Sequence, residues 1–178
     1  MSILAWHFVG ATLRDGRPVP ADGETLVHDG PVVICKSGLH ASRSLLDALQ
    51  YAPGATLCRV RCGGVVTEDG DKLVCTERTI LWRIDAVPVL RAFARRCALD
   101  AARLRDAPDV VRWYLETDDR PLRAAAWAAW DAAIPLHRDA ATGAAWAVAR
   151  AAARAAQRKN LTRMVHAAHR AQVTEDKP

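Results

Sequence analysis

Hydrophobic and polar residues alternate in several short runs of the first ninety residues, a pattern typical of half-buried β-strands. Gly, Pro and Asp cluster between these runs, as they do in turns. A short apolar stripe at helical spacing predicts one helix over residues 44–51, with Ser42 or Ser44 as its N-cap. Strands are predicted over residues 3–9, 31–34, 55–61, 65–66, 72–75 and 79–84.

The second half changes to runs of alanine broken by arginine and tryptophan, and its apolar spacing is helical. Val87-Pro88-Val89 is the predicted hinge, because proline disfavours helix at the residue before it. Trp127, Trp130 and Ile134 share one helix face, against which Trp146 is expected to pack. Helices are predicted over residues 90–107, 110–116, 120–134, 139–159 and 161–172.

These patterns predict an α+β protein: a small, mostly antiparallel β domain with one short helix, followed by an all-α helical bundle rich in Ala and Trp. The expected boundaries are 1–87 for the α+β domain, 88–173 for the helical domain and 174–178 for a disordered tail.

The composition indicates where in the cell the protein is located and in which state its cysteines are. No apolar run reaches the length of a membrane span, and the first residues lack the pattern of a signal peptide. We therefore expect a cytoplasmic protein whose 5 cysteines are reduced. Cys58 and Cys62 are four residues apart, so in a strand they face the same side, and they lack the close spacing of zinc ligands. We therefore expect them to be small buried core residues and expect no metal site.

Positive charge is concentrated in the second half, which holds 16 of the 25 basic residues. Arg150, Arg154 and Arg158 recur every four residues, and Arg163 continues this basic helical face. The face suits an acidic protein partner or nucleic acid, but the pattern favours a solvated helix face, because charge alone specifies no partner. No aromatic residue follows Trp146 to provide a stacking platform for bases. We expect a bacterial protein partner and keep nucleic acid and a homodimer as alternatives.

The segment Gly38-Leu39-His40-Ala41-Ser42, with Ala48 and Tyr51 following, resembles the second signature of ADP-ribosyltransferases of the diphtheria-toxin and poly(ADP-ribose) polymerase type. A histidine in this signature is similar to the RNA 2′-phosphotransferase branch. His7 is similar to the histidine of that family's first strand, and Glu77 to the glutamate that opens a late strand.

The resemblance implies a catalytic trio of His7, His40 and Glu77, with Ser42 and Tyr51 as ligand-binding residues. The histidines would orient NAD, and the carboxylate would stabilise an oxocarbenium-like transition state. NAD is the implied cofactor if the protein is an enzyme, and otherwise no cofactor is expected.

A second resemblance is to uncharacterised phage and prophage proteins, through Cys35–Ser42 and Asp47–Gly54. The helical half is similar to helical proteins that bacterial mobile elements encode and that have been proposed to be immunity proteins. Since the first domain is short for a transferase, the leading hypothesis is a mobile-element interaction protein that acts through protein binding on an ADP-ribosyltransferase-like scaffold. Inhibition of a bacterial defence system is a role that such a protein would serve. The alternatives are an active ADP-ribosyltransferase or RNA 2′-phosphotransferase-like enzyme and, third, a nucleic-acid-binding protein that uses the basic helical face.

Overall fold

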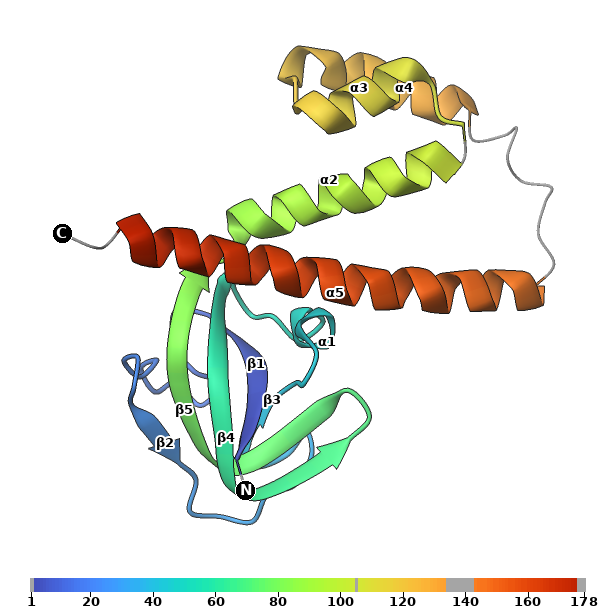
Figure 1. Cartoon of the computed structure of the whole chain (residues 1–178). Coiled ribbons are helices and arrows are strands. Elements are labelled where there is room, and N and C mark those ends of the chain that lie inside the picture. Colours follow the sequence, from blue (N-terminus) through green and yellow to red (C-terminus); the bar gives the residue numbers. More distant parts are fainter. Residues whose placement is uncertain (1, 105, 134–142, 176–178) are drawn as a thin grey trace. The chain divides into compact units, whose positions relative to one another are not determined.

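The computed structural model of the chain describes residues 2–104, 106–133 and 143–175 (Figure 1). It confirms the predicted fold class, with an antiparallel sheet in the N-terminal part and helices in the C-terminal part. The strands are β1 (Ile3–Val9), β2 (Thr25–Val27), β3 (Leu39–Ala41), β4 (Thr56–Asp69) and β5 (Lys72–Asp85). The helices are α1 (Leu45–Leu49), α2 (Val87–Leu104), α3 (Asp109–Thr117), the 3-10 turn η1 (Arg120–Leu122), α4 (Arg123–Ala133) and α5 (Gly143–Glu175).

Two compact units divide the chain. The first comprises Met1–Val89 together with Arg158–Pro178, and the second comprises Leu90–Gln157. The helical region therefore contributes to both units, because the C-terminal part of α5 packs with the N-terminal sheet. None of the described helices combines the length and the apolar character that crossing a membrane requires.

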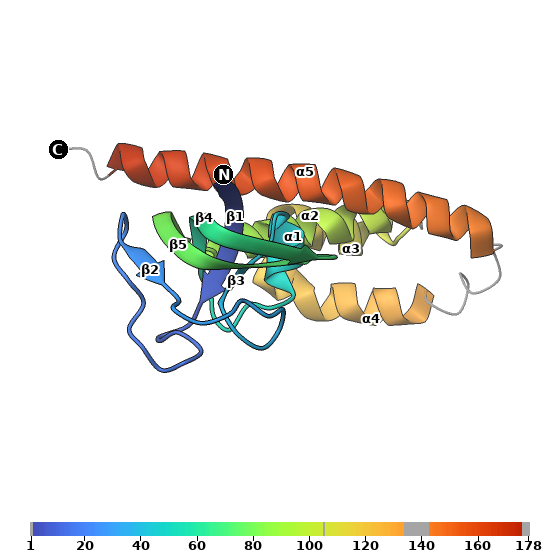
Figure 2. The same ribbon diagram turned by 90° about the horizontal axis from the view of Figure 1, so that it is seen from below.

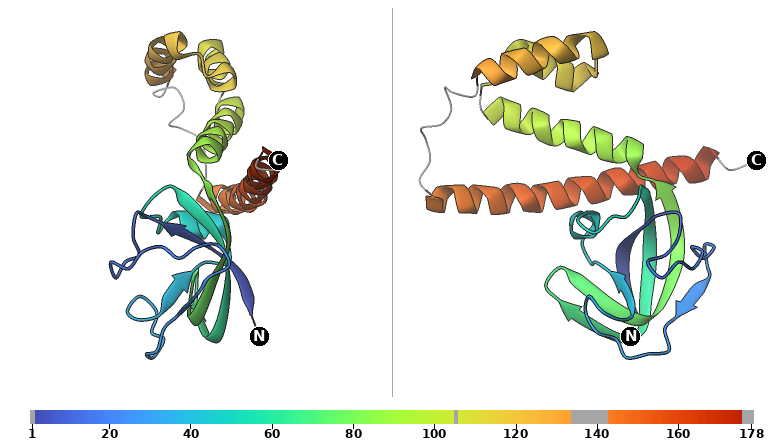
Figure 3. Two further views of the ribbon diagram at one scale, coloured as in Figure 1. Left: turned by 90° about the vertical axis from the view of Figure 1, so that its left-hand side faces the viewer. Right: turned by 180° about the vertical axis from the view of Figure 1, so that it is seen from behind.

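The sheet of the first unit is built around the long hairpin of β4 and β5, which curves strongly (Figure 3). β1 pairs with β4, and both β2 and β3 pair with β5, all antiparallel. The sequence pattern predicted two strands in place of each long one. They join because the Gly63–Val66 segment forms a register shift that bends β4 without ending it.

One predicted strand, residues 31–34, is wrong. Val33 and Ser37 exchange backbone hydrogen bonds of 2.9 Å across a tight turn, and Cys35 at its tip has a positive φ of 64°. The strand begins later, at Leu39. β2 was not predicted, since its three residues are too few to show a period.

The two faces of the sheet are covered differently. One face forms a core of small and branched residues that includes Cys58 and Cys62, both fully buried, which confirms their predicted role. Trp6 and Trp82 lie on the opposite face against His166 of α5. Figure 2 shows the C-terminal part of α5 on one side of the β4–β5 hairpin and β2 and β3 with their loops on the other.

In the second unit, α2, α3 and α4 enclose a small apolar cluster that includes Ala102, Val111 and Ala126. Trp130 packs against it, whereas Trp127 is 57% exposed. Ile134 and the side chain of Trp146 lie outside the described residues. α2 begins three residues before its predicted start, because Pro88 is tolerated in the first turn of a helix.

Helix α5 replaces the two helices predicted over residues 139–159 and 161–172, of which residues 139–142 lie outside the described ranges. Asn160 is a weaker helix former than alanine, but its helix cost is only about 0.7 kcal/mol. The next residue, Leu161, is fully buried, and its packing holds the helix through this point.

Candidate functional site

A cavity of about 580 Å³ opens on the core side of the sheet, between β1, β3, α1 and the loops that follow β1 and precede β3. Its volume lies within the usual range of small-molecule sites, about 300–1,000 Å³. Four of the residues proposed from the sequence line it: His7, His40, Ser42 and Tyr51. Glu77 does not; it is exposed on β5, opposite Val27 on the neighbouring strand.

Arg78, the neighbour of Glu77, lines the cavity and is only 4% exposed. Its Nη1 donates a 2.6 Å hydrogen bond to the carbonyl oxygen of His40, while its buried Nε has no partner in the structure. None of the ion pairs between described residues includes Arg78. Burying a charge without a counter-charge costs several kcal/mol, so this arginine needs an explanation other than stability.

The groups around Arg78 that can become negative are thiols. Burial raises the pKa of Cys58 to about 11, so that thiol is neutral at pH 7. A hydrogen bond with Cys62 lowers the pKa of Cys75, and the charge of Arg78 acts in the same direction. Cys75 also donates its thiol hydrogen to the carbonyl oxygen of Leu39, at 3.2 Å.

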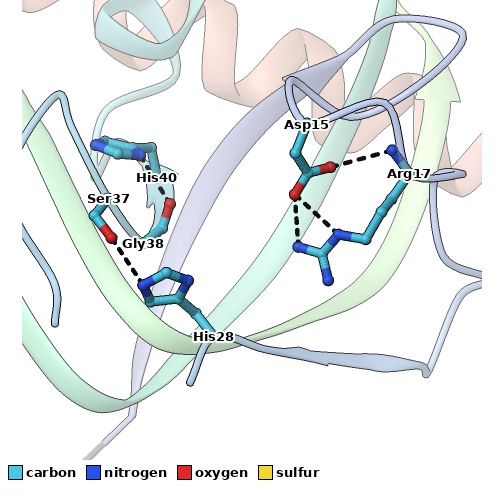
Figure 4. A network of polar contacts seen from close by, with 6 residues as sticks. All are labelled: Asp15, Arg17, His28, Ser37, Gly38 and His40. Carbon is cyan, nitrogen blue, oxygen red and sulfur yellow. Dashed lines mark hydrogen bonds and ion pairs between the residues drawn. The ribbon is translucent and has the colours of Figure 1, made fainter. Parts of the chain in front are cut away.

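The His40 ring holds the loop before β3 (Figure 4). Its Nε2 accepts the backbone N–H of Cys35 at 2.9 Å, and its Nδ1 therefore carries the proton and donates to the carbonyl oxygen of Gly38 at 3.1 Å. Burial lowers the pKa of His40, whereas the hydrogen bond to Gly38 raises it. The positive charges of Arg14, Arg78 and Lys72 lower the pKa further. The ring is thus neutral, and both of its nitrogens are engaged within the loop.

His7 lies on β1 opposite Cys58 and faces the cavity. Burial, followed by the charge of Arg78 and the nearby His40, holds the pKa of His7 well below its usual value. No hydrogen bond from the described part of the chain contributes to this shift. His7 therefore presents a neutral imidazole to the cavity.

Basic side chains dominate the rim. Arg17 is paired with Asp15 at 2.7 Å (Figure 4), and Asp15 is the one carboxylate among the described lining residues. Arg14, Lys72 and Arg78 also line the cavity, and none of them forms an ion pair with a carboxylate of the described residues. A concave surface with an excess of one charge concentrates ions of the other sign, so the cavity attracts anions.

The remaining predicted residues have other surroundings. Ser42 is buried, and its backbone exchanges hydrogen bonds of 2.8 and 2.9 Å with that of Trp6. Ser44 precedes α1, but its side chain makes no capping hydrogen bond. Tyr51 lies at the rim with its hydroxyl donating to Asp71 at 2.7 Å.

The arginines of the predicted basic face of α5 have different surroundings. Arg158 binds both carboxylate oxygens of Asp47 on α1, at 2.9 and 3.1 Å, and so holds α5 on the first unit. Arg154 is exposed, and Arg163 is exposed with a hydrogen bond to Asn160. The side chain of Arg150 lies outside the described residues. Within the described ranges, no group of His, Cys, Asp and Glu side chains is placed to hold a metal ion.

Fold and cavity together define an α+β protein in which a curved antiparallel sheet encloses a positively charged cavity. The chain belongs to the family described as a domain of unknown function (DUF7666), whose model matches residues 3–92. All the cavity-lining residues fall inside that matched region. No curated protein and no solved structure matched the chain. The resemblances to ADP-ribosyltransferases and to mobile-element proteins stay predictions.

Proposed function

We propose that the first unit binds a small phosphate-bearing molecule of nucleotide size in the cavity, with Arg78 as its anchor. The observation that carries the proposal is the burial of the Arg78 guanidinium beside the cavity without a carboxylate. A phosphate supplies the missing negative charge and accepts several charge-assisted hydrogen bonds at once. Arg14 and Lys72 at the rim provide further contacts for such a ligand.

The proposal is for binding rather than for cleavage of a glycosidic bond. A transferase of the kind implied by the sequence resemblance needs a free carboxylate beside the reacting sugar, and Glu77 lies outside the cavity. Asp15 is paired with Arg17, and the His40 ring already uses both nitrogens. His7 and Arg78 remain as groups that can hold a ligand without reacting with it.

Calorimetric titration with ADP, inorganic pyrophosphate and NAD⁺ tests the proposal. We expect ADP or pyrophosphate to bind the parent protein and Arg78→Met to weaken that binding by about 30-fold or more, because removing one partner of a buried charge pair costs about 2–5 kcal/mol. Glu77→Gln is the matched control, since it alters the adjacent, exposed residue and should bind as the parent does. Absence of binding by all three probes, or equal binding by Arg78→Met, would overturn the proposal.

The same variants separate binding from catalysis. If NAD⁺ binds and Glu77→Gln loses NAD⁺ while keeping ADP, the transferase interpretation replaces the present one. If Arg78→Met loses binding of both ADP and NAD⁺ while Glu77→Gln keeps both, the result supports Arg78 as a phosphate anchor.

Stability without ligand provides an independent readout for Arg78→Met. Removing a buried charge that has no counter-charge removes a desolvation cost of several kcal/mol, which offsets the hydrogen bond that is lost to the carbonyl oxygen of His40. We expect urea unfolding of the variant to show a free energy equal to or above that of the parent. Such a result excludes misfolding as the reason for lost binding.

A further inference from the structure

We propose that Arg158 of α5 is a positioning residue for the cavity: it holds α1, which forms one of the cavity walls, so that ligand binding and the docking of the C-terminal part of α5 are linked. The inference deepens the proposed function and rests on it in one respect, namely that the cavity binds a ligand. Two observations carry it: the ion pair of the buried Asp47 with Arg158, and the position of Asp47 directly before a residue that lines the cavity.

Helix α1 is too short to be stable by itself. It has 5 residues, Leu45–Leu49, and isolated helices of that length are unstable in water. The side chain of Ser44 at its start makes no capping hydrogen bond. Ala48 within α1 and Tyr51 just after it line the cavity. The position of this wall therefore depends on contacts with other segments of the chain.

Asp47 makes such a contact with a distant segment. Its side chain is 10% exposed, and the Nη2 of Arg158 donates to both of its carboxylate oxygens, at 2.9 and 3.1 Å. Without the arginine, a charge would remain buried and unpaired, which is strongly destabilising. α1 would then shift to bring Asp47 into water, and the adjacent Ala48, which is 5% exposed, would move with it.

The effect of Arg158 on a ligand passes through α1. Arg158 is not among the described residues that line the cavity, whereas Ala48 is. Coupling between two sites is reciprocal, so release of α5 from α1 lowers the affinity of the cavity, and a bound ligand strengthens the contact between α5 and α1. The C-terminal part of α5 therefore regulates the cavity without lining it.

The test combines amide hydrogen exchange, read by mass spectrometry, with calorimetric titration of ADP on the full chain. The amides of Ala48, Gln50 and Tyr51 report on α1, since each donates to a backbone carbonyl of residues 44–48. We expect Arg158→Met to speed their exchange about 10-fold or more, a lower bound that allows for the half-exposed arginine. It should weaken ADP binding about 5-fold or more, the lower end of the usual coupling between sites. Peptides from β4 and β5 are the internal reference, because their exchange also rises if the variant unfolds as a whole.

Two variants separate positioning from charge. Arg163→Met is the matched control, because it removes the same charge from the same helix at an exposed position. It should leave α1 exchange and ADP affinity as in the parent. Arg158→Lys should restore most of both, since a single nitrogen of Arg158 makes both contacts and an ammonium group can take its place.

Asp47→Asn provides the test if Arg158→Met fails to fold, because it leaves no buried charge unpaired. It should also speed α1 exchange and weaken ADP binding, since the amide loses the charge-assisted part of the contact. Arg158→Met added to Asp47→Asn should have little further effect, because both substitutions act on one interaction.

Unchanged α1 exchange in Arg158→Met, or an equal rise in Arg163→Met, overturns this inference even if ADP binds the parent. Faster α1 exchange with unchanged ADP affinity also overturns it, because the wall would then not be coupled to the ligand. If the parent binds none of ADP, pyrophosphate and NAD⁺ while Arg158→Met selectively speeds α1 exchange, the proposed function alone is overturned, and Arg158 remains the residue that positions the cavity wall.

Discussion

At the scale of single residues, the cavity combines a buried cation with neutral imidazoles. Arg78 contributes to the lowered pKa values of both His7 and His40, in each case after burial as the first cause. Burial, with the positive field as a second cause, thus keeps these rings unprotonated in the folded protein. An anion bound at Arg78 would offset that field and favour protonation of His7.

The first prediction concerns pH. In the unfolded chain a histidine titrates near pH 6.5, whereas the pKa of His7 in the fold is well below this. As the pH falls below about 6.5, the unfolded state therefore takes up more protons than the folded state. The free energy of unfolding should decrease by up to about 1.4 kcal/mol per pH unit for each such histidine. Above pH 7 this contribution is constant.

Urea unfolding of the parent and of His7→Gln at pH 7.5, 6 and 5 measures the effect. His7→Gln should lose less stability between pH 7.5 and 5, because one group that resists protonation is gone, while His40 and His166 still contribute. Identical pH dependence in the two proteins would contradict the assignment of a depressed pKa to His7.

Of the five residues that the family resemblance implied, four line the cavity and one lies outside it. His7, His40, Ser42 and Tyr51 line a single cavity, as the resemblance implied. Glu77 was chosen in place of Arg78 on the resemblance alone, and regular alternation from the buried Cys75 would likewise turn residue 77 inward. The bend of the hairpin reverses this parity, so Cys75 and Arg78 are both buried. Periodicity alone does not reveal such a bend.

At the scale of elements, the bend depends on Gly64. It has a positive φ of 66°, and a Cβ there would lie only 2.0 Å from the Oγ1 of Thr76. That oxygen accepts the backbone N–H of Val65 at 3.0 Å, so the two strands meet closely at the register shift. The paired glycines 63 and 64 were a visible signal, but glycine also marks the ends of strands.

The second prediction follows from this geometry. Gly64→Ala should lower the free energy of unfolding by about 2–3 kcal/mol, from backbone strain and displacement of Thr76 together. Gly16→Ala is the control, since its φ is also positive, at 82°, but nothing lies within 4 Å of the added Cβ. That variant should lose only about 1 kcal/mol. Equal losses in urea unfolding would show that the contact with Thr76 has no energetic role.

At the scale of the whole molecule, the order of elements along the chain differs from their grouping in space. The strand and helix periods correctly predicted a sheet followed by helices. They contain no information on which helix packs against which sheet face, since that depends on contacts between distant segments. Leu161 and Val165 of α5 are fully buried, and His169 stacks on Trp82 with ring centres 4.0 Å apart. This part of α5 lies outside the region matched by the family model.

The third prediction is that the matched region needs this helix to fold. A fragment of residues 1–92 would expose the sheet face that carries Trp6 and Trp82, together with Asp47 freed from Arg158. We expect the fragment alone to unfold without a cooperative transition, as followed by tryptophan fluorescence in urea. A peptide of residues 158–178, added in trans, should restore a cooperative transition, because it supplies the two buried aliphatic side chains and the arginine.

A peptide carrying Leu161→Asp and Val165→Asp is the matched control, and it should leave the fragment unfolded because each aspartate would bury an unpaired charge. Cooperative unfolding of residues 1–92 without any peptide would contradict the prediction. Restoration by the parent peptide alone would instead make the C-terminal part of α5 an integral element of the sheet domain. The cavity of the first unit would then depend on a segment separated from it, along the chain, by the entire second unit.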